Sequence, residues 1–477
     1  MNCRKRVFFG TAVSIACIFL TAGCTSSGKE TSAGNTESGS GAVDISEMFT
    51  SRDMDFTYEE DRAVKIELSD EGSCCDSGGV EMSDSAVTIL KEGTYILSGS
   101  LKEGQIIVDA VIFSKGDLTL NGTGSLSISA AYGHGIVSKD DLALTGGNYQ
   151  ITAASHALSG KDSVRIAAGN FRLNAGKDGI QADYGTETEE ASDDGSKGFI
   201  YISGGEFQIT AGDDGMQASS LAQIADGKYR IGAVDDGIHA DAEASVHRGE
   251  LTISECYEGI EGQTVAITGG IISIISEDDG LNAAGGNDQS SFAGGQREDP
   301  FAVDEDSEIR ISGGTITINA SGDGIDSNGN LYVSGGEIYV SGPENDGNGA
   351  LDYAGEAQIT GGLVVAAGGS GMAQNFGEGS SQGTMLVNLS EWTEGTAVLT
   401  DSSGAEVISC TPEKRYNSIL ISTPQIQQGE TYILTAGGQE NTVEMAGLVY
   451  GSGGMGGGMG APGRGGRQEG MEGKPMF

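Results

Sequence analysis

The sequence predicts an all-β chain: a single-stranded parallel β-helix of about ten coils, each of roughly 22 residues, with β caps at both ends. Two successive copies of one unit start at Ile202 and Ile224, 22 residues apart. Within each copy, apolar and polar residues alternate in three short runs separated by Gly-rich turns. A unit this small cannot bury its inward side chains alone, whereas stacked copies bury them between neighbours.

The same unit recurs along most of the chain. The aligned starts are Leu120, Leu144, Ile166, Ile202, Ile224, Val246, Ile267, Ile311, Val333 and Ile359. One predicted inward column reads Tyr149, Phe171, Phe207, Tyr229, Leu251, Ile272, Ile316, Ile338 and Val364. The next reads Ile151, Leu173, Ile209, Ile231, Ile253, Ile274, Ile318 and Val340. Parallel strands strongly prefer right-handed crossovers, so we expect a right-handed helix.

The first residues resemble a lipoprotein signal peptide, which we place at 1–23. Three basic residues precede an apolar run from Val7 to Leu20, and small residues then lead to Cys24. We expect a lipid on Cys24, with residues 24–43 as a flexible tether. The chain would then be extracellular, held to the cell membrane only through this lipid. An ordinary secretory signal with an incidental cysteine is the alternative.

The rest of the chain divides into four segments. Residues 111–383 hold the coils, and residues 44–110 and 384–450 carry strand patterns that would cap their two open ends. Strands of the second cap are predicted at Met385–Leu389, Ala397–Thr400, Ser418–Ser422 and Thr431–Thr435. Residues 451–477 contain 12 glycines and are expected to be disordered. We expect the protein to be a monomer.

The chain is strongly acidic. Its formal net charge is −43, and removal of residues 1–23, which hold Arg4, Lys5 and Arg6 but no acid, would bring it to −46. Such a charge argues against nucleic acids and anionic membrane surfaces as partners. It favours cations, and polyanions that are bridged by cations.

Acidic residues recur at one corner of the coils. The residues directly before a Gly there are Asp178, Asp214, Asp236, Glu258, Asp279, Asp323 and Asp346, while Asp213, Asp235 and Asp278 double the charge and Asp183, Asp241 and Asp326 follow at the far end of the next strand. Coils stack about 4.8 Å apart, and two like charges 5 Å apart repel by about 3 kcal/mol at an effective dielectric near 20. Carboxylates and corner carbonyls are ligands that Ca²⁺ prefers, so we predict Ca²⁺ between coils. Favourable Asp-Gly turn chemistry is the alternative.

Two outward rows are candidates for binding a polysaccharide. The first follows the third strand of each coil beside insertions at Tyr184–Phe199 and Ala284–Glu308, and it includes Gln181, Gln217, His239, Glu261, Asn282 and Asp326. The second follows the middle strand and includes Arg172 and Arg230. Tyr184 is a candidate for stacking on a sugar ring. A solvated face without a ligand is the alternative for the first row.

Several segments together resemble a known family. They are Ile89-Leu-Lys-Glu-Gly-Thr-Tyr-Ile-Leu-Ser-Gly, Gln105-Ile-Ile-Val-Asp-Ala, Gly135-Ile-Val-Ser-Lys-Asp-Asp-Leu, the repeated Ser-Gly-Gly and Asp-Asp-Gly-Ile coils, and Gly429-Glu-Thr-Tyr-Ile-Leu. This combination resembles the clostridial carbohydrate-binding β-helix proteins. The resemblance implies a surface protein related in fold to pectate lyases, with calcium in the coils and binding to cellulose-like or pectic polysaccharides. Ala110 and Val111 directly join segments between which the family usually has further coils.

Three functions are compatible with these features. The leading hypothesis is a cell-surface lipoprotein that binds cellulose-like or pectic polysaccharide through a calcium-loaded β-helix, without catalysis. A calcium-dependent polysaccharide lyase is the first alternative, but β-elimination needs a base beside the cation and no basic cluster faces the acidic corner, so we assign no catalytic residue. The second alternative is a structural surface adhesin or spacer.

Overall fold

The computed structural model describes residues 48–51, 53–55, 63–69, 74–75, 80–82, 87–89, 95–100, 110–114, 116–185, 196–284 and 303–451. The predictions for the signal peptide at 1–23, the lipid on Cys24, the tether up to residue 43 and the tail from residue 452 lie outside these residues. No described helix is long and apolar enough to cross a membrane.

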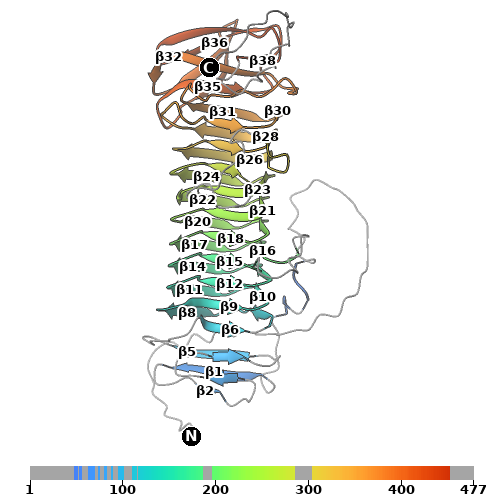
Figure 1. The fold of residues 1–477 in the computed structure, drawn as a ribbon, viewed down its shortest axis with the longest axis vertical. Coiled ribbons are helices and arrows are strands. Elements are labelled where there is room, and N and C mark those ends of the chain that lie inside the picture. The colour runs from blue at the N-terminus through green and yellow to red at the C-terminus, as the bar shows by residue number, and fades with distance from the viewer. Residues whose placement is uncertain are drawn as a thin grey trace, which may run out of the picture.

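The described chain folds into a column of stacked coils, which confirms the predicted parallel β-helix (Figure 1). Each coil contributes one strand to each of three parallel rows, and no helix occurs among the described residues. The first row contains β7 (Leu118–Leu120), β10 (Asp141–Leu144), β13 (Ser163–Ile166), β16 (Phe199–Ile202), β19 (Leu221–Ile224), the second half of β21 (Ile238–Val246), the second half of β23 (Ile260–Ile267), the first halves of β26 (Glu308–Ala320) and β28 (Asn330–Ser341), and β30 (Ala357–Ile359).

The second and third rows complete each coil. The second row contains β8 (Ser125–Ala130), β11 (Asn148–Ala153), β14 (Asn170–Ala175), β17 (Glu206–Ala211), β20 (Lys228–Gly232), β22 (Glu250–Glu255), β24 (Ile271–Ser276), the second halves of β26 and β28, and β31 (Leu363–Gly368). The third row contains β9 (His134–Ser138), β12 (Leu158–Gly160), β15 (Ile180–Ala182), β18 (Met216–Ala218), the first halves of β21 and β23, β25 (Leu281–Ala283), β27 (Ile325–Ser327) and β29 (Leu351–Tyr353).

Both predicted inward columns form the core. Every residue in them is at most 4% exposed. Four rings of the first column, Tyr149, Phe171, Phe207 and Tyr229, stack in chain order with centroids 4.9, 4.6 and 4.8 Å apart and interplanar angles of 3°, 5° and 6°. These centroid separations lie in the range of offset-stacked rings. The spacing of the coils therefore builds a continuous aromatic stack inside the solenoid.

Glycine at the acidic corner is required by close packing between coils. An added Cβ on Gly215 would lie 2.4 Å from the carbonyl oxygen of Gly237. On Gly280 it would lie 2.3 Å from Ile318 Cγ2 and 2.5 Å from the oxygen of Gly324. These approaches are too short for any side chain. The Asp-Gly pairs are thus explained by the stacking of the corners and not by turn preference alone.

Residues near the start of the chain lie against the first coils. Strand β1 (Val64–Ser69) pairs with β2 (Cys74–Cys75) and, in parallel, with β5 (Tyr95–Ser100). Strand β3 (Val80–Met82) pairs with β4 (Val87–Ile89), which runs parallel to β6 (Ala110–Ser114). Met48 lies upstream of β1, and its carbonyl accepts a hydrogen bond of 2.7 Å from Arg165 Nη1. Part of the segment before the first strand therefore follows the outer face of the first row.

Antiparallel strands close the other end of the solenoid. Strand β31 pairs with β35 (Tyr416–Ser422), which pairs with β32 (Thr384–Thr393), and β32 pairs with β38 (Val449–Tyr450). Strands β34 (Glu406–Cys410), β33 (Ala397–Asp401), β36 (Thr431–Ala436) and β37 (Gln439–Glu444) form a separate sheet. The four strands predicted in this segment are therefore present. Because β35 is antiparallel to β31, the parallel stacking ends there.

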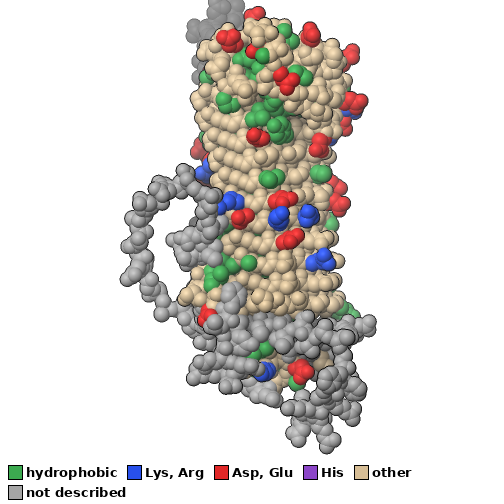
Figure 2. All heavy atoms as spheres, turned by 180° about the vertical axis from the view of Figure 1, so that it is seen from behind, with side chains coloured by type: hydrophobic (Ala, Val, Ile, Leu, Met, Phe, Trp, Pro, Cys, Tyr) green, Lys and Arg blue, Asp and Glu red, His purple; other side chains and the backbone are tan. Residues whose placement is uncertain are grey.

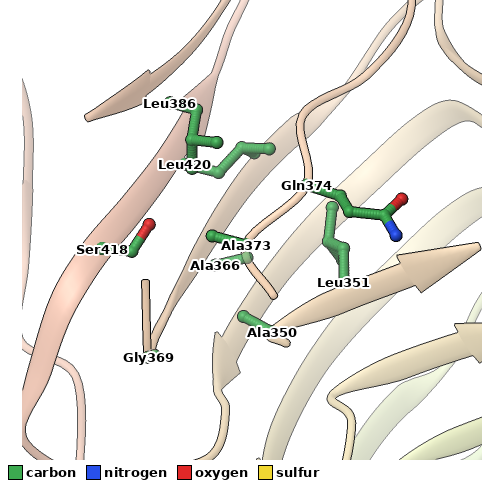
Figure 3. A pocket seen from close by; sticks show the side chains of 10 residues that line it. Ala350, Leu351, Ala366, Gly369, Ala373, Gln374, Leu386, Ser418 and Leu420 are labelled. Carbon is green, nitrogen blue, oxygen red and sulfur yellow. The ribbon is translucent and has the colours of Figure 1, made fainter. Parts of the chain in front are cut away.

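The junction with these strands is tightly packed. Ala350, Leu351 and Ala366 of the last coils face Leu386 and Leu420 around a cavity of about 10 Å³ (Figure 3). A space of this size holds about one water molecule. The junction is therefore closed to larger ligands.

Candidate functional site

The acidic corner forms a continuous ladder of side chains along the solenoid. We call it the corner ladder, and it consists of His134, His156, Asp178, Asp214, Asp236, Glu258, Asp279 and Asp323. Each member stands two residues before the first core residue of a third-row strand. Asp178, Asp236, Glu258 and Asp279 are buried, although they are carboxylates. The ladder therefore removes a row of acidic groups from water.

Hydrogen bonds between coils fix the ladder. The Oδ1 atom of Asp214 accepts a bond of 2.9 Å from the backbone N–H of Asp236. Asp279 accepts one of 2.6 Å from the N–H of Asp323, whose own carboxylate accepts one from the N–H of Gly349. One oxygen of each of these carboxylates thus caps the corner of the following coil. This structural role accounts for one oxygen atom and leaves the other for a different partner.

Burial raises the pKa values of several ladder carboxyls above those of exposed carboxyls. It raises the pKa of Asp214 and of Glu258 to about 8, and that of Asp279 to about 9, with neighbouring carboxylates adding to the shift. It raises the pKa of Asp323 to about 7. Without a cation, the ladder is therefore costly to ionise near neutral pH.

Two members of the ladder and one neighbouring acid form a group whose possible metal ligands are all oxygen atoms. Ligand oxygens of Asp279, Asp323 and Asp326 lie within 4.8 Å of one another. Asp326 lies outward on β27, and Asp279 and Asp323 are consecutive members of the ladder. Three carboxylates at one point fit the donor preference of Ca²⁺, which takes six to eight oxygens. We call this group the oxygen cluster.

The other predicted metal ligands have different surroundings. Asp213, Asp235 and Asp278 are half-buried beside the ladder, and Asp183 is exposed. Asp241 lies 3.3 Å from His239 Nε2. Asp346 is exposed and does not join the ladder, because Ile325 pairs with Leu351 and Gly349 therefore takes the position that follows Asp323. The predicted acids thus divide between the ladder and its border.

The structure extends the ladder to two histidines that the sequence reasoning missed. His134 and His156 stack with their ring centroids 4.9 Å apart, and His156 Nδ1 lies 2.8 Å from Asp178 Oδ2. His134, His156 and Asp178 follow one another at intervals of 22 residues, and this interval is the period of the coil. That spacing could have identified them, but neither fits the pattern of an acidic residue before Gly, since both are histidines and Ala157 follows His156.

The outward row beside the ladder is less exposed than the sequence pattern indicated. Gln181 and Gln217 are half-buried, while His239, Glu261 and Asn282 are at most 6% exposed. The amide of Asn282 donates a hydrogen bond of 2.6 Å to Glu258 Oε2. His239 and Asn282 therefore contact the ladder, and the row leaves little surface for a sugar.

The second outward row lines an open groove. The groove crosses β8, β11, β14, β17 and β20 and has a volume of about 620 Å³. Exposed Arg172, Arg230 and Glu206 contribute to its lining, with the amides of Gln150, Asn170 and Gln208 between or beside them. Arg172 Nε donates a hydrogen bond of 3.2 Å to Gln208 Oε1. On the face seen from behind, basic and acidic side chains lie together at mid-height of the solenoid (Figure 2).

Tyr184 is half-buried and has cationic neighbours. The Nζ atoms of Lys161 and Lys197 lie 4.6 and 4.4 Å from its ring centroid. Lys197 also forms an ion pair of 2.9 Å with Asp162. The ring is therefore engaged in cation–π contacts within the protein.

These features place the chain in the class of single-stranded parallel β-helix proteins that have an acidic ladder on one side and a polar groove on another. Residues 108–298 match the model of a family described as "Carbohydrate-binding domain-containing protein". This match agrees with the resemblance found in the sequence, and it spans the whole groove and most of the corner ladder.

One solved structure is also similar, the polysaccharide lyase-like protein from C. thermocellum, in a gadolinium derivative. It has 17% sequence identity and a TM-score of 0.31, with 62% of this chain and 97% of that chain covered. No curated protein matches the sequence.

Proposed function

We propose that this chain is a non-catalytic, cell-surface lipoprotein that binds pectic or cellulose-like polysaccharide in the second-row groove, with Ca²⁺ in the oxygen cluster supporting the coils. The observation that carries the proposal is the groove of Arg172, Arg230 and amide side chains inside the segment that matches the carbohydrate-binding family. Amides pair with sugar hydroxyls, and Arg pairs with carboxylates in bidentate fashion.

The dimensions of the groove support an extended ligand. Arg172 and Arg230 are separated by two coil steps, since Arg172 pairs with Gln208 and Gln208 with Arg230. Two steps of about 4.8 Å place their backbones about 10 Å apart along the solenoid axis. A polymer of uronates lying along the axis could therefore meet both guanidinium groups. This makes polygalacturonate the first ligand to test.

The separation of the two sites favours binding over lyase activity. A calcium-dependent lyase needs a base and a cation at the same uronate unit. The two arginines lie on the second row, whereas the oxygen cluster is built from the corner before the third row and from β27. The groove and the oxygen cluster therefore lie on different rows of the solenoid, which supports binding at the arginines over cleavage there.

We expect Arg172→Ala and Arg230→Ala each to weaken polygalacturonate binding about tenfold, because a charge-assisted hydrogen bond contributes about 1.5–3 kcal/mol and part of it is replaced by water. Affinity electrophoresis in polygalacturonate, run with Ca²⁺ and with a chelator, measures the change. Arg310→Ala is the matched control, because Arg310 is an exposed arginine on the first row.

Three polymers test the proposal as a whole: polygalacturonate, cellulose and peptidoglycan. Retention on one of the first two, lost in the double arginine variant, supports it. Equal retention of that variant would refute the groove as the binding site. Release of products that absorb in the ultraviolet would favour the lyase alternative, and lack of retention on all three polymers would favour the spacer.

A further inference from the structure

A buried histidine lies among carboxylates in the middle of the corner ladder. His239 is 6% exposed, and its Nδ1 atom lies 2.7 Å from Glu261 Oε2 and 3.1 Å from Asp236 Oδ2. Its other ring nitrogen, Nε2, lies 3.3 Å from Asp241 Oδ1. Asp236 belongs to the ladder, while His239 and Glu261 pair in register on the adjacent outward row. Three ligand atoms from two successive coils therefore converge at one point.

A protonated imidazole cannot supply hydrogen bonds to all the carboxylate oxygens around it. A ring nitrogen carries one hydrogen, so Nδ1 can direct a good hydrogen bond to one of the two carboxylates. Glu261 is 3% exposed, and its second oxygen, Oε1, has no hydrogen-bond partner in the described part of the chain. A buried carboxylate oxygen without a partner is costly. A metal ion beside Nδ1 could instead contact Asp236 and both oxygens of Glu261.

Neighbouring side chains also leave oxygens unsatisfied along the same row. Asn282 pairs with Glu261 in the following coil and is 2% exposed. The Oδ1 atom of Asn282 is buried without a partner among the described residues. The same holds for Oε1 of Gln217. Gln217 lies one coil before His239, and Glu261 and Asn282 lie one and two coils after it, so three of four successive coils present an oxygen that no protein donor in the described residues satisfies.

We propose that Asp236, His239 and Glu261 form a binding site for a transition metal ion of the Zn²⁺ type, chemically distinct from the oxygen cluster. Imidazole and carboxylate together suit Zn²⁺, whereas Ca²⁺ takes oxygen ligands. Tetrahedral Zn²⁺ with bonds of about 2.0–2.1 Å places ligand atoms about 3.3 Å apart, so binding requires the Nδ1–Oε2 separation to open slightly. The ligand atoms of the three residues already lie within 4.8 Å of one another.

The position of Asp241 agrees with metal binding through Nδ1. A histidine that binds a metal through one nitrogen usually donates its other N–H to a carboxylate, which fixes the ring and makes the ligand more basic. Asp241 occupies that place at Nε2. We therefore assign Asp241 a positioning role and Asp236, His239 and Glu261 the role of ligands.

Cobalt is the probe for this site, because Co²⁺ replaces Zn²⁺ and absorbs visible light in a way that reports its ligands. The full protein, freed of metals by chelator and returned to excess Ca²⁺, is titrated with Co²⁺ and then with Zn²⁺. We expect one Co²⁺ per chain with a visible ligand-field band, displaced by one equivalent of Zn²⁺. His239→Gln should weaken Co²⁺ binding at least 100-fold, and Asp241→Asn should weaken it 10- to 100-fold.

Glu255→Gln is the matched control, since Glu255 is an exposed acid on β22 outside the corner ladder, the oxygen cluster and the groove, and its loss should leave the Co²⁺ band unchanged. Glu261→Gln provides a second ligand variant if His239→Gln does not give the circular dichroism of the parent. Stoichiometric Co²⁺ binding that persists in both ligand variants would refute the site. The absence of Co²⁺ binding, with an imidazole NMR signal of His239 that stays protonated, would also refute it and identify the group as an ion-paired imidazolium.

Discussion

Phe207→Ala is expected to lower the free energy of unfolding by about 3–5 kcal/mol, the usual cost of truncating a buried aromatic residue. Phe207 is 1% exposed and lies between Phe171 and Tyr229, with ring centroids 4.6 and 4.8 Å away. The coils above and below are held by strand pairing and cannot collapse into the space. The truncation therefore leaves a cavity and also removes two ring contacts.

Urea unfolding followed by circular dichroism measures this loss. Thr210→Ala is the control, because Thr210 is exposed on the same strand, β17, and its truncation should change stability by less than about 0.5 kcal/mol. Phe207→Leu should fall between the two, since it keeps part of the apolar volume. A loss below 1 kcal/mol for Phe207→Ala would mean that the aromatic stack contributes little to the solenoid.

The stack also explains why the fold could be predicted from the sequence. Tyr149, Phe171, Phe207 and Tyr229 recur at coil spacing, and residues two apart share a face in any strand. Stacking of coils is the arrangement that buries all of them, so periodicity alone fixed the core columns. The same reasoning failed at Asp346, because the coil after Asp323 is longer, and strand pairing moves Gly349 into the ladder position.

The chemistry of the site was harder to predict because it depends on side-chain directions. The sequence placed Gln181, Gln217 and His239 on an outward row, and outward residues of a β-helix usually face water. Here carboxylates of the corner and of the next coil contact that row, so His239 is buried beside Asp236 and Glu261. The groove with Arg172 and Arg230 was within reach of the sequence, since an outward row on adjacent coils is continuous.

Stability in the presence of a chelator is expected to fall as the pH rises from 6 to 8. The folded pKa values of Asp214, Glu258 and Asp279 are raised to about 8, 8 and 9, whereas in the unfolded chain these groups ionise near pH 4. Between these limits the folded state binds more protons. The stability contributed by the protonated groups is complete below the unfolded pKa and is lost as the pH rises toward the folded value.

The size of this effect follows from proton linkage. Each extra proton held by the folded state lowers the unfolding free energy by about 1.4 kcal/mol per pH unit. If the interacting ladder carboxyls retain one proton between them, the loss from pH 6 to 8 is about 2.7 kcal/mol. Ca²⁺ binds the ionised groups and should offset this loss, since a ligand at 100 times its Kd stabilises the folded state by about 2.7 kcal/mol.

The variant Asp279→Asn distinguishes the effect of proton uptake on stability from the effect of Ca²⁺ binding. In chelator at pH 8 the variant should be more stable than the parent, because Asp279, with a pKa of about 9, must take up a proton on folding, whereas Asn needs none. In Ca²⁺ it should be less stable, because the oxygen cluster loses a ligand. Thermal unfolding at pH 6, 7 and 8, with Glu305→Gln as an exposed control, tests this reversal. A parent whose stability in chelator stays constant or rises with pH would show that the ladder is ionised without a metal, and a variant with the same sign of change in both conditions would exclude Asp279 as a calcium ligand.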